Sequence, residues 1–291
     1  MTAANLTPVR AELDLNGRRL SYLDFGGTGQ PLLALHGHLD QGLMWSGLAT
    51  ALAPGWRVIA PDQRGHGESD RAADYSRGGY LADLAALLGQ LNPGPVVALG
   101  HSLGGLNAYQ LAARHPHLVR ALVIEEMGVV LSAPSHLDFL LASPYEAATR
   151  DELMTGLGPA GPMFAERLKQ LPDGTWRLPF HPHDMVASER ANWGNYWADW
   201  LATGCPALLL AGENSPLTRG QAQAMAEQRP NTRLVELHGD HFVHAQDPDG
   251  FTGAIRDFLG SLDNHRAPDQ ALPADQILAP SARLGARRRQ A

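Results

Sequence analysis

Short apolar runs bounded by glycine and proline recur along the first 130 residues and again after residue 204. Runs of four to seven residues of this kind are typical of strands buried in a sheet. Asn16-Gly17 between the first two runs is a signal for an antiparallel hairpin. The pattern predicts strands over residues 11–15, 19–25, 31–35, 57–60, 96–99, 121–124, 207–211 and 233–237.

Between most of these runs, apolar residues are spaced three or four positions apart, as on one face of a helix. Leu81, Leu84, Leu87, Leu88 and Leu91 show this spacing. Strands that alternate with helices favour an α/β fold with a parallel sheet covered on both faces. The predicted helices are residues 45–52, 80–91, 106–114, 220–228 and 251–262.

The alternation stops between about residues 130 and 203, where prolines and glycines recur and no buried strand is predicted. Trp193, Tyr196, Trp197 and Trp200 follow the i, i+3, i+4, i+7 spacing of one helix face. An insertion between two sheet strands lies over the carboxyl ends of the strands, where such sheets bind ligands. We expect this segment to form a cap, with Trp193 and Trp197 reaching the substrate and the other aromatics in the cap core.

The most informative stretch is V-V-A-L-G-H-S-L-G-G, residues 96–105. It predicts a buried strand, a tight turn containing Gly100, Ser102 and Gly104, and then a helix. This is the setting of a nucleophile elbow, in which the turn lifts the serine hydroxyl clear of the sheet. The amide of Leu103 would lie at the positive end of the following helix, where it can stabilise an anion.

Three further motifs accompany the elbow: His36-Gly37, the sequence D-Q-R-G-H-G-E-S at residues 62–69, and H-G-D-H-F-V-H-A-Q-D-P at residues 238–248. Together the four motifs resemble the α/β-hydrolase fold family over about residues 13–262. The resemblance implies a doubly wound, mostly parallel eight-stranded sheet, with the nucleophile after the fifth strand and a helical cap after the sixth. It also implies that the loop at residues 62–69 is structural.

The resemblance divides the chain into a first part of the core (residues 1–129), a cap (130–203) and a second part of the core (204–263). The remaining segment, residues 264–291, is rich in alanine, proline and arginine and has no hydrophobic periodicity. Such a composition is typical of a disordered tail.

A serine needs a neighbouring base, and the family places a histidine between the last strand and the final helix. His241 matches that position, although Asp240 stands where the family usually has glycine. His238 and His244 are the alternatives. The resemblance assigns the oxyanion hole to the backbone N–H groups of His38 and Leu103, and the His38 side chain could contact substrate.

The acid that orients the histidine departs from the common pattern. Most family members place an aspartate after the seventh strand, where this chain has Ser215. A serine cannot stabilise an imidazolium as a carboxylate does. Some members use a glutamate after the sixth strand, which corresponds to Glu126, with Glu125 as the second choice. Glu213 or Asp240 acting as the acid is the remaining alternative.

Net charge, cysteine content and motif spacing limit the partners and cofactors that we expect for this chain. The net charge of −7 gives no general affinity for nucleic acid or anionic membranes. Cys205 is the only cysteine, which excludes an internal disulfide and a cysteine-based zinc site. No metal-ligand spacing such as H-E-x-x-H occurs, so neither a metal nor another cofactor is predicted. No signal-peptide core or 18-residue apolar run is present, and we therefore expect a cytoplasmic protein without a membrane partner.

These observations predict a serine hydrolase that cleaves an ester or related acyl compound through an acyl-enzyme on Ser102. The aromatics of the cap favour a small-molecule substrate with an apolar or aromatic group. A cofactor-free perhydrolase (haloperoxidase-like) and a C–C bond hydrolase are alternatives on the same fold. A catalytically inactive ligand-binding receptor is the alternative from another class. The sequence leaves the oligomeric state open.

Overall fold

The computed structural model describes residues 6–215 and 219–264. An eight-stranded sheet forms its centre, in the order β1-β2-β4-β3-β5-β6-β12-β13. The β1–β2 and β2–β4 pairs are antiparallel and the other five are parallel, which confirms the predicted mostly parallel sheet. The strands are β1 Val9–Asp14, β2 Arg19–Asp24, β3 Gln30–Leu35, β4 Trp56–Pro61, β5 Val96–His101, β6 Val119–Glu125, β12 Ala207–Gly212 and β13 Thr232–Leu237.

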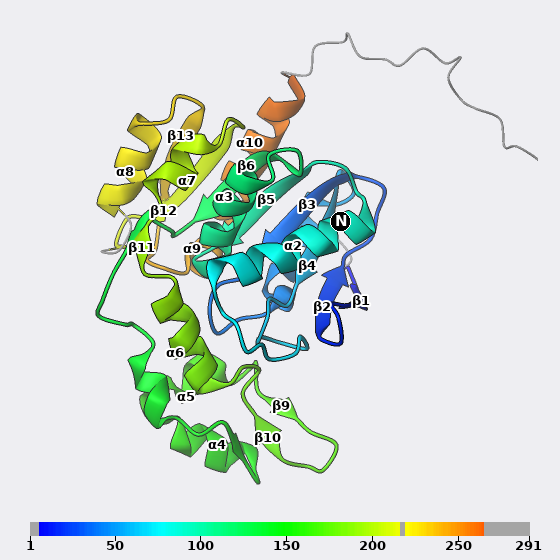
Figure 1. Cartoon of the computed structure of the whole chain (residues 1–291), viewed down its shortest axis with the longest axis vertical. Coiled ribbons are helices and arrows are strands. Elements are labelled where there is room, and N and C mark those ends of the chain that lie inside the picture. The colour runs from blue at the N-terminus through cyan, green and yellow to red at the C-terminus, as the bar shows by residue number, and fades with distance from the viewer. Residues whose placement is uncertain (1–5, 216–218, 265–291) are drawn as a thin grey trace, which may run out of the picture.

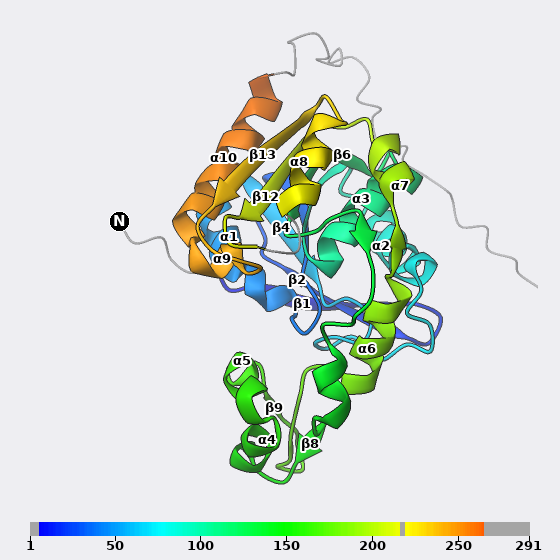
Figure 2. The same ribbon diagram turned by 90° about the vertical axis from the view of Figure 1, so that its left-hand side faces the viewer.

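Helices cover both faces of this sheet, as Figures 1 and 2 show. Along β3, Leu33 and Leu35 belong to the hydrophobic cluster under α2, α3 and α8, whereas Leu32 and Ala34 belong to the cluster under α1 and α10. Successive side chains of a strand point to opposite faces, so an all-apolar strand contributes side chains to the hydrophobic clusters on both faces of the sheet. The helices are α1 Ser46–Leu52, α2 Arg77–Leu91, α3 Leu103–Arg114, α8 Arg219–Glu227, α9 Val243–Gln246 and α10 Pro248–Asn264, and a 3₁₀ turn, Gly42–Trp45, precedes α1.

Between β6 and β12 the chain forms short helices and two-residue strands. In Figure 2 the part labelled α4, α5, β8 and β9 lies beyond one end of the main sheet, whereas α7 lies beside α3. Leu140, Leu153, Phe164 and Met185 of this inserted segment form a third hydrophobic cluster together with Leu39, Tyr75, Tyr80 and Leu103 of the core. The division of the chain at residues 130 and 203 stays a prediction. The elements of the segment are β7 Val130–Leu131, β8 Glu146–Ala147, α4 Arg150–Gly156, α5 Gly161–Phe164, β9 Lys169–Gln170, β10 Trp176–Arg177, α6 Pro182–Ala191, β11 Gly194–Asn195 and α7 Trp197–Ala202, with 3₁₀ turns at Asp138–Ala142 and Gly158–Ala160.

The expectation that four aromatics share one helix face is wrong. Helix α7 begins at Trp197, so Trp193 and Tyr196 precede it, and Gly194 lies in β11. The backbone N–H of Tyr196 donates to Val129 O, and this link across the start and end of the segment interrupts the helix. Trp200 is fully buried and its indole N–H donates to the carbonyl of Met225.

The expected disordered tail, residues 264–291, lies outside the described residues apart from Asn264, the last residue of α10. None of the helices in the described ranges combines the length and apolar character that crossing a membrane requires.

The loop at residues 62–69 is braced by a buried carboxylate. Asp62 Oδ1 accepts a hydrogen bond from the backbone N–H of Gly42 (2.8 Å). Its Oδ2 accepts from Arg10 Nη1 (2.6 Å) and from the backbone N–H of Glu68 (2.9 Å). Asp62 therefore joins β1, the turn before α1 and its own loop, which agrees with the structural role expected of this motif.

We expect Asp62→Ala to lower the free energy of unfolding by about 2–4 kcal/mol, because it leaves buried N–H donors without an acceptor. Urea denaturation monitored by circular dichroism measures this change. Asp173→Ala is the matched control, since Asp173 is exposed and its carboxylate accepts only from Thr175 in the same turn. Equal midpoints for the two variants would contradict the bracing role of Asp62.

Candidate active site

Ser102 lies at the turn between β5 and α3 with a strained backbone, φ 49° and ψ −118°. Positive φ is unfavourable for a residue with a side chain and persists only where the surroundings enforce it. The two glycines of the motif are sterically required. A Cβ on Gly100 would overlap the carbonyl of Gly104, and one on Gly104 would overlap the carbonyl of Leu35. This geometry is that of a nucleophile elbow.

The loop after β3 passes directly beside Ser102. A Cβ on Gly37 would lie 3.3 Å from Ser102 Cβ and 2.6 Å from His101 Nδ1. His36 fixes this loop, because its Nε2 accepts from the backbone N–H of Gln63 (2.9 Å) and its Nδ1 donates to Gly37 O (2.7 Å). Burial lowers the pKa of His36 to about 4, so the imidazole is neutral and able to accept.

Glu126 and His241 face each other beside the elbow, with 3.6 Å between Glu126 Oε2 and His241 Nδ1. The Glu126 carboxylate is buried and accepts from the backbone N–H of Gly212 (2.6 Å) and from Ser215 Oγ (2.6 Å). The two bonds fix the position of the carboxyl group. Ser215, which occupies the position where most family members have the acid, thus holds the carboxylate that comes from the neighbouring strand.

The alternative histidines and acids have other partners. His244 Nδ1 bonds to Glu125 Oε1 at 2.8 Å, in the interior. His238 Nδ1 bonds to Glu213 Oε1 at 2.7 Å, on the surface. The exposed Asp240 carboxylate accepts from a backbone N–H two residues later.

Ser102, Glu126 and His241 all line one cavity of about 620 Å³. No lysine or arginine of the described chain is among its lining residues. Its walls are mainly apolar and include Leu39, Met127, Leu137, Phe139, Met163 and Trp193.

Of the three side chains expected to contact substrate, His38 and Trp193 line this cavity. Trp197 instead packs against the hydrophobic cluster beneath α2, α3 and α8, so its position does not support the expected contact. His38 Nε2 bonds to Ser188 Oγ (2.9 Å), and Ser188 also bonds to the hydroxyl of Tyr80 (2.7 Å). Burial and then the neighbouring His66 keep the pKa of His38 well below its usual value.

The sequence pattern did not reveal Ser188 or Tyr80 as neighbours of the cavity. His38 and Ser188 are 150 positions apart in the chain, and neither Ser188 nor Tyr80 lies in a motif. No spacing rule connects them, because the contacts form only when Ser188 of α6 reaches His38 in the loop after β3 and Tyr80 of α2.

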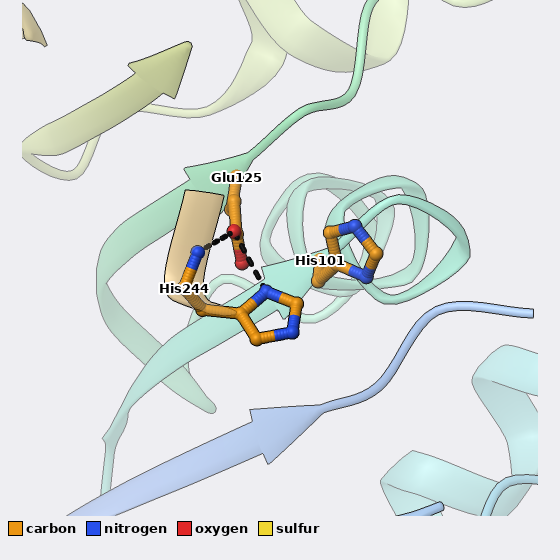
Figure 3. A group of neighbouring side chains, drawn as sticks. All are labelled: His101, Glu125 and His244. Carbon is orange, nitrogen blue, oxygen red and sulfur yellow. Dashed lines mark hydrogen bonds and ion pairs between the residues drawn. The ribbon is translucent and has the colours of Figure 1, made fainter. Parts of the chain in front are cut away.

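One group of side chains in the described ranges has the composition of a metal site. Ligand atoms of His101, Glu125 and His244 lie within 4.8 Å of one another. Figure 3 shows the three side chains together. Tetrahedral zinc with 2.0–2.1 Å bonds places its ligands about 3.4 Å apart. Glu125 and His244 already bond to each other, and His101 Nε2 bonds to the carbonyl of His241 (2.8 Å). The arrangement therefore resembles a hydrogen-bonded network more closely than a metal centre.

The sequence profile of the alpha/beta hydrolase fold family matches residues 30–248. The chain belongs to this family. It is 29% identical over 248 residues to the 2-(acetamidomethylene)succinate hydrolase of Mesorhizobium japonicum, covering 80% of this chain and 89% of that protein. It is also 29% identical over 281 residues to the mouse sn-1-specific diacylglycerol lipase ABHD11, covering 84% and 87%.

Among solved structures, the crystal structure of E-2-(acetamidomethylene)succinate hydrolase is similar, with a TM-score of 0.75 and 25% identity. The match covers 87% of this chain and all of that one. The relatives confirm that this α/β hydrolase is an enzyme of the hydrolase class.

The steric account of the elbow in this hydrolase predicts that Gly104→Ala will abolish labelling of Ser102 by a fluorophosphonate probe and lower the melting temperature. Gly89→Ala is the matched control, because Gly89 lies in α2 with open space where its Cβ would go. A helical Gly→Ala change of this kind stabilises by about 0.5–1 kcal/mol. Normal labelling of Gly104→Ala would contradict the account.

Proposed function

We propose that this protein is a serine hydrolase that cleaves carboxylic esters of neutral, largely apolar small molecules. The observation that carries the proposal is that Ser102, His241 and Glu126 line the same cavity, with Ser102 on a strained elbow. If the proposal is wrong, the chain still belongs to the α/β hydrolase family and to the hydrolase class.

In the proposed reaction, His241 takes the proton of the Ser102 hydroxyl while the oxygen attacks the ester carbonyl. The backbone N–H groups of Leu103 and His38 stabilise the oxyanion of the tetrahedral intermediate. The imidazolium then protonates the departing alcohol, which leaves an acyl group on Ser102. Water, deprotonated by the same histidine, releases the acid and restores the serine. Glu126 stabilises the His241 imidazolium during both acylation and deacylation.

The lining of the cavity supports a neutral substrate with an extended apolar part. Val130, Phe139, Met163 and Trp193 line it and are 42%, 44%, 47% and 39% exposed. They are half of the eight large hydrophobic side chains exposed in the described ranges. Apolar surface gathered at a cavity is characteristic of a ligand-binding site. A dicarboxylate such as the substrate named for the Mesorhizobium relative would find no lysine or arginine in this lining.

Replacing Ser102 by alanine should lower ester hydrolysis by about 10⁴-fold or more and leave the circular dichroism spectrum unchanged. Activity is measured on p-nitrophenyl butyrate and labelling with a fluorophosphonate probe. More than a tenth of the parent activity in Ser102→Ala would refute the acyl-enzyme. A parent protein that neither turns over esters nor reacts with the probe would refute the proposed ester chemistry.

Glu126→Gln should lower kcat by about 10²–10⁴-fold, because the amide favours the wrong tautomer of His241 and cannot stabilise its charged form. Ser215→Ala should cost less than tenfold, since Gly212 still donates to the carboxylate. Glu213→Gln is the matched control, with its carboxylate on the surface beside His238. Near-normal kcat in Glu126→Gln would move the acid elsewhere.

Across p-nitrophenyl esters from acetate to decanoate, we expect kcat/KM to rise with acyl length, because each buried methylene contributes about 0.8 kcal/mol. Trp193→Ala should reduce this gain for the long esters while leaving the acetate rate within about twofold. A p-nitrophenyl monosuccinate should react at least about tenfold more slowly than the butyrate, since its carboxylate would be desolvated unpaired. A preference for the succinate would overturn the proposed substrate class.

A further inference from the structure

Three histidines between the end of β13 and the first turn of α9 each have Nδ1 within 4 Å of a different glutamate carboxylate. His238, His241 and His244 are spaced three apart, and their partners are Glu213, Glu126 and Glu125 respectively. The first pair is exposed and the second lies in the active-site cavity. The third pair is buried next to the second, and the reaction proposed above makes no use of it.

The third pair joins the end of β6 to the start of α9. Glu125 Oε1 accepts from both the backbone N–H and the side-chain Nδ1 of His244, each at 2.8 Å. Dashed lines in Figure 3 mark both bonds. Glu125 is completely buried, and the His244 side chain is 13% exposed. The two bonds fix both the backbone and the ring of His244 on one carboxyl oxygen. This contact therefore holds the backbone of the loop three residues after His241.

His101 holds the same loop at His241 itself. Its Nε2 donates to the carbonyl of His241 at 2.8 Å, and its ring lies 4.8 Å from that of His241 and 5.1 Å from that of His244. Burial keeps the pKa of His101 well below its usual value, so the ring is neutral. The residues that precede Ser102 and Glu126 in the chain, His101 and Glu125, thus contact the loop that carries the base.

We propose that Glu125 and His244 form a positioning pair that keeps the His241 ring in place between Glu126 and Ser102. The inference rests on the proposed function, in which His241 is the base. The separation of 3.6 Å between His241 Nδ1 and Glu126 Oε2 is already longer than a hydrogen bond. A small further displacement of the loop would therefore remove the orienting contact. Misplacement of a catalytic group by about 1 Å can cost 10²-fold in rate.

The test compares Glu125→Gln, His244→Gln and the double variant with the parent, using Glu213→Gln as the control for the exposed pair. The amount of active enzyme is first determined by exhaustive fluorophosphonate labelling, so that kcat refers to labelled sites only. We expect kcat per labelled site to fall about 10–100-fold in each single variant, with KM changed less than about threefold. The double variant should be no worse than the single variants, because the pair acts as one unit. Glu213→Gln should keep the parent kcat.

Two results would overturn the proposal. An unchanged kcat per labelled site, accompanied by a lower melting temperature, would make the pair a stabilising contact only. A loss in Glu125→Gln as large as that in Glu126→Gln would make Glu125 the acid itself. Failure of the proposed function is distinguishable from both, because it would appear as residual activity in Ser102→Ala.

Discussion

Close contact between the elbow and the loop after β3 is the constraint on which the site depends. Gly104 lies against the carbonyl of Leu35, and Gly37 lies against Ser102. Backbone strain of the kind seen at Ser102 costs about 1–3 kcal/mol and requires surroundings that permit no other conformation. Two parallel strands, β3 and β5, run side by side and supply those surroundings. The packing that holds the serine in place also brings the backbone of residues 36–38 beside it.

Three acidic side chains are buried at the same end of the sheet. Asp62, Glu125 and Glu126 all lie at or just beyond strand ends, and each is almost inaccessible to solvent. Desolvating a carboxylate is costly unless several donors surround it. Each accepts from at least one backbone N–H, provided by Gly42 and Glu68, by His244, and by Gly212 respectively. The three acidic side chains therefore fix the loops around the site.

The inserted segment completes the cavity through polar and apolar contacts with the core. Ser188 of α6 bonds to both His38 and Tyr80, and the Tyr80 ring lies beneath the guanidinium of Arg77 (5.4 Å). Arg77 is itself buried and bonds to Asn192, whose side chain is next to the cavity wall. Burial lowers the pKa of Arg77 to about 10, and the group remains charged at neutral pH. A buried cation held by amide oxygens thus connects α2 to the end of α6.

The local sequence determined the strands, the helices and the elbow, because hydrophobic periodicity and glycine sterics act between neighbouring residues. All eight predicted strands are present, with ends shifted by a few residues. The resemblance to the family ranked Glu126 above Glu125 as the acid, and this assignment stays a prediction. The prediction that Trp193 to Trp200 share one helix face was wrong, because the hydrogen bond from Tyr196 N–H to Val129 O interrupts the helix. Only the tertiary structure decided which glutamate meets which histidine, since each pair joins residues 25 to 119 positions apart and no periodicity relates them. Such pairings depend on which strands lie side by side and on which way each side chain turns at a strand end.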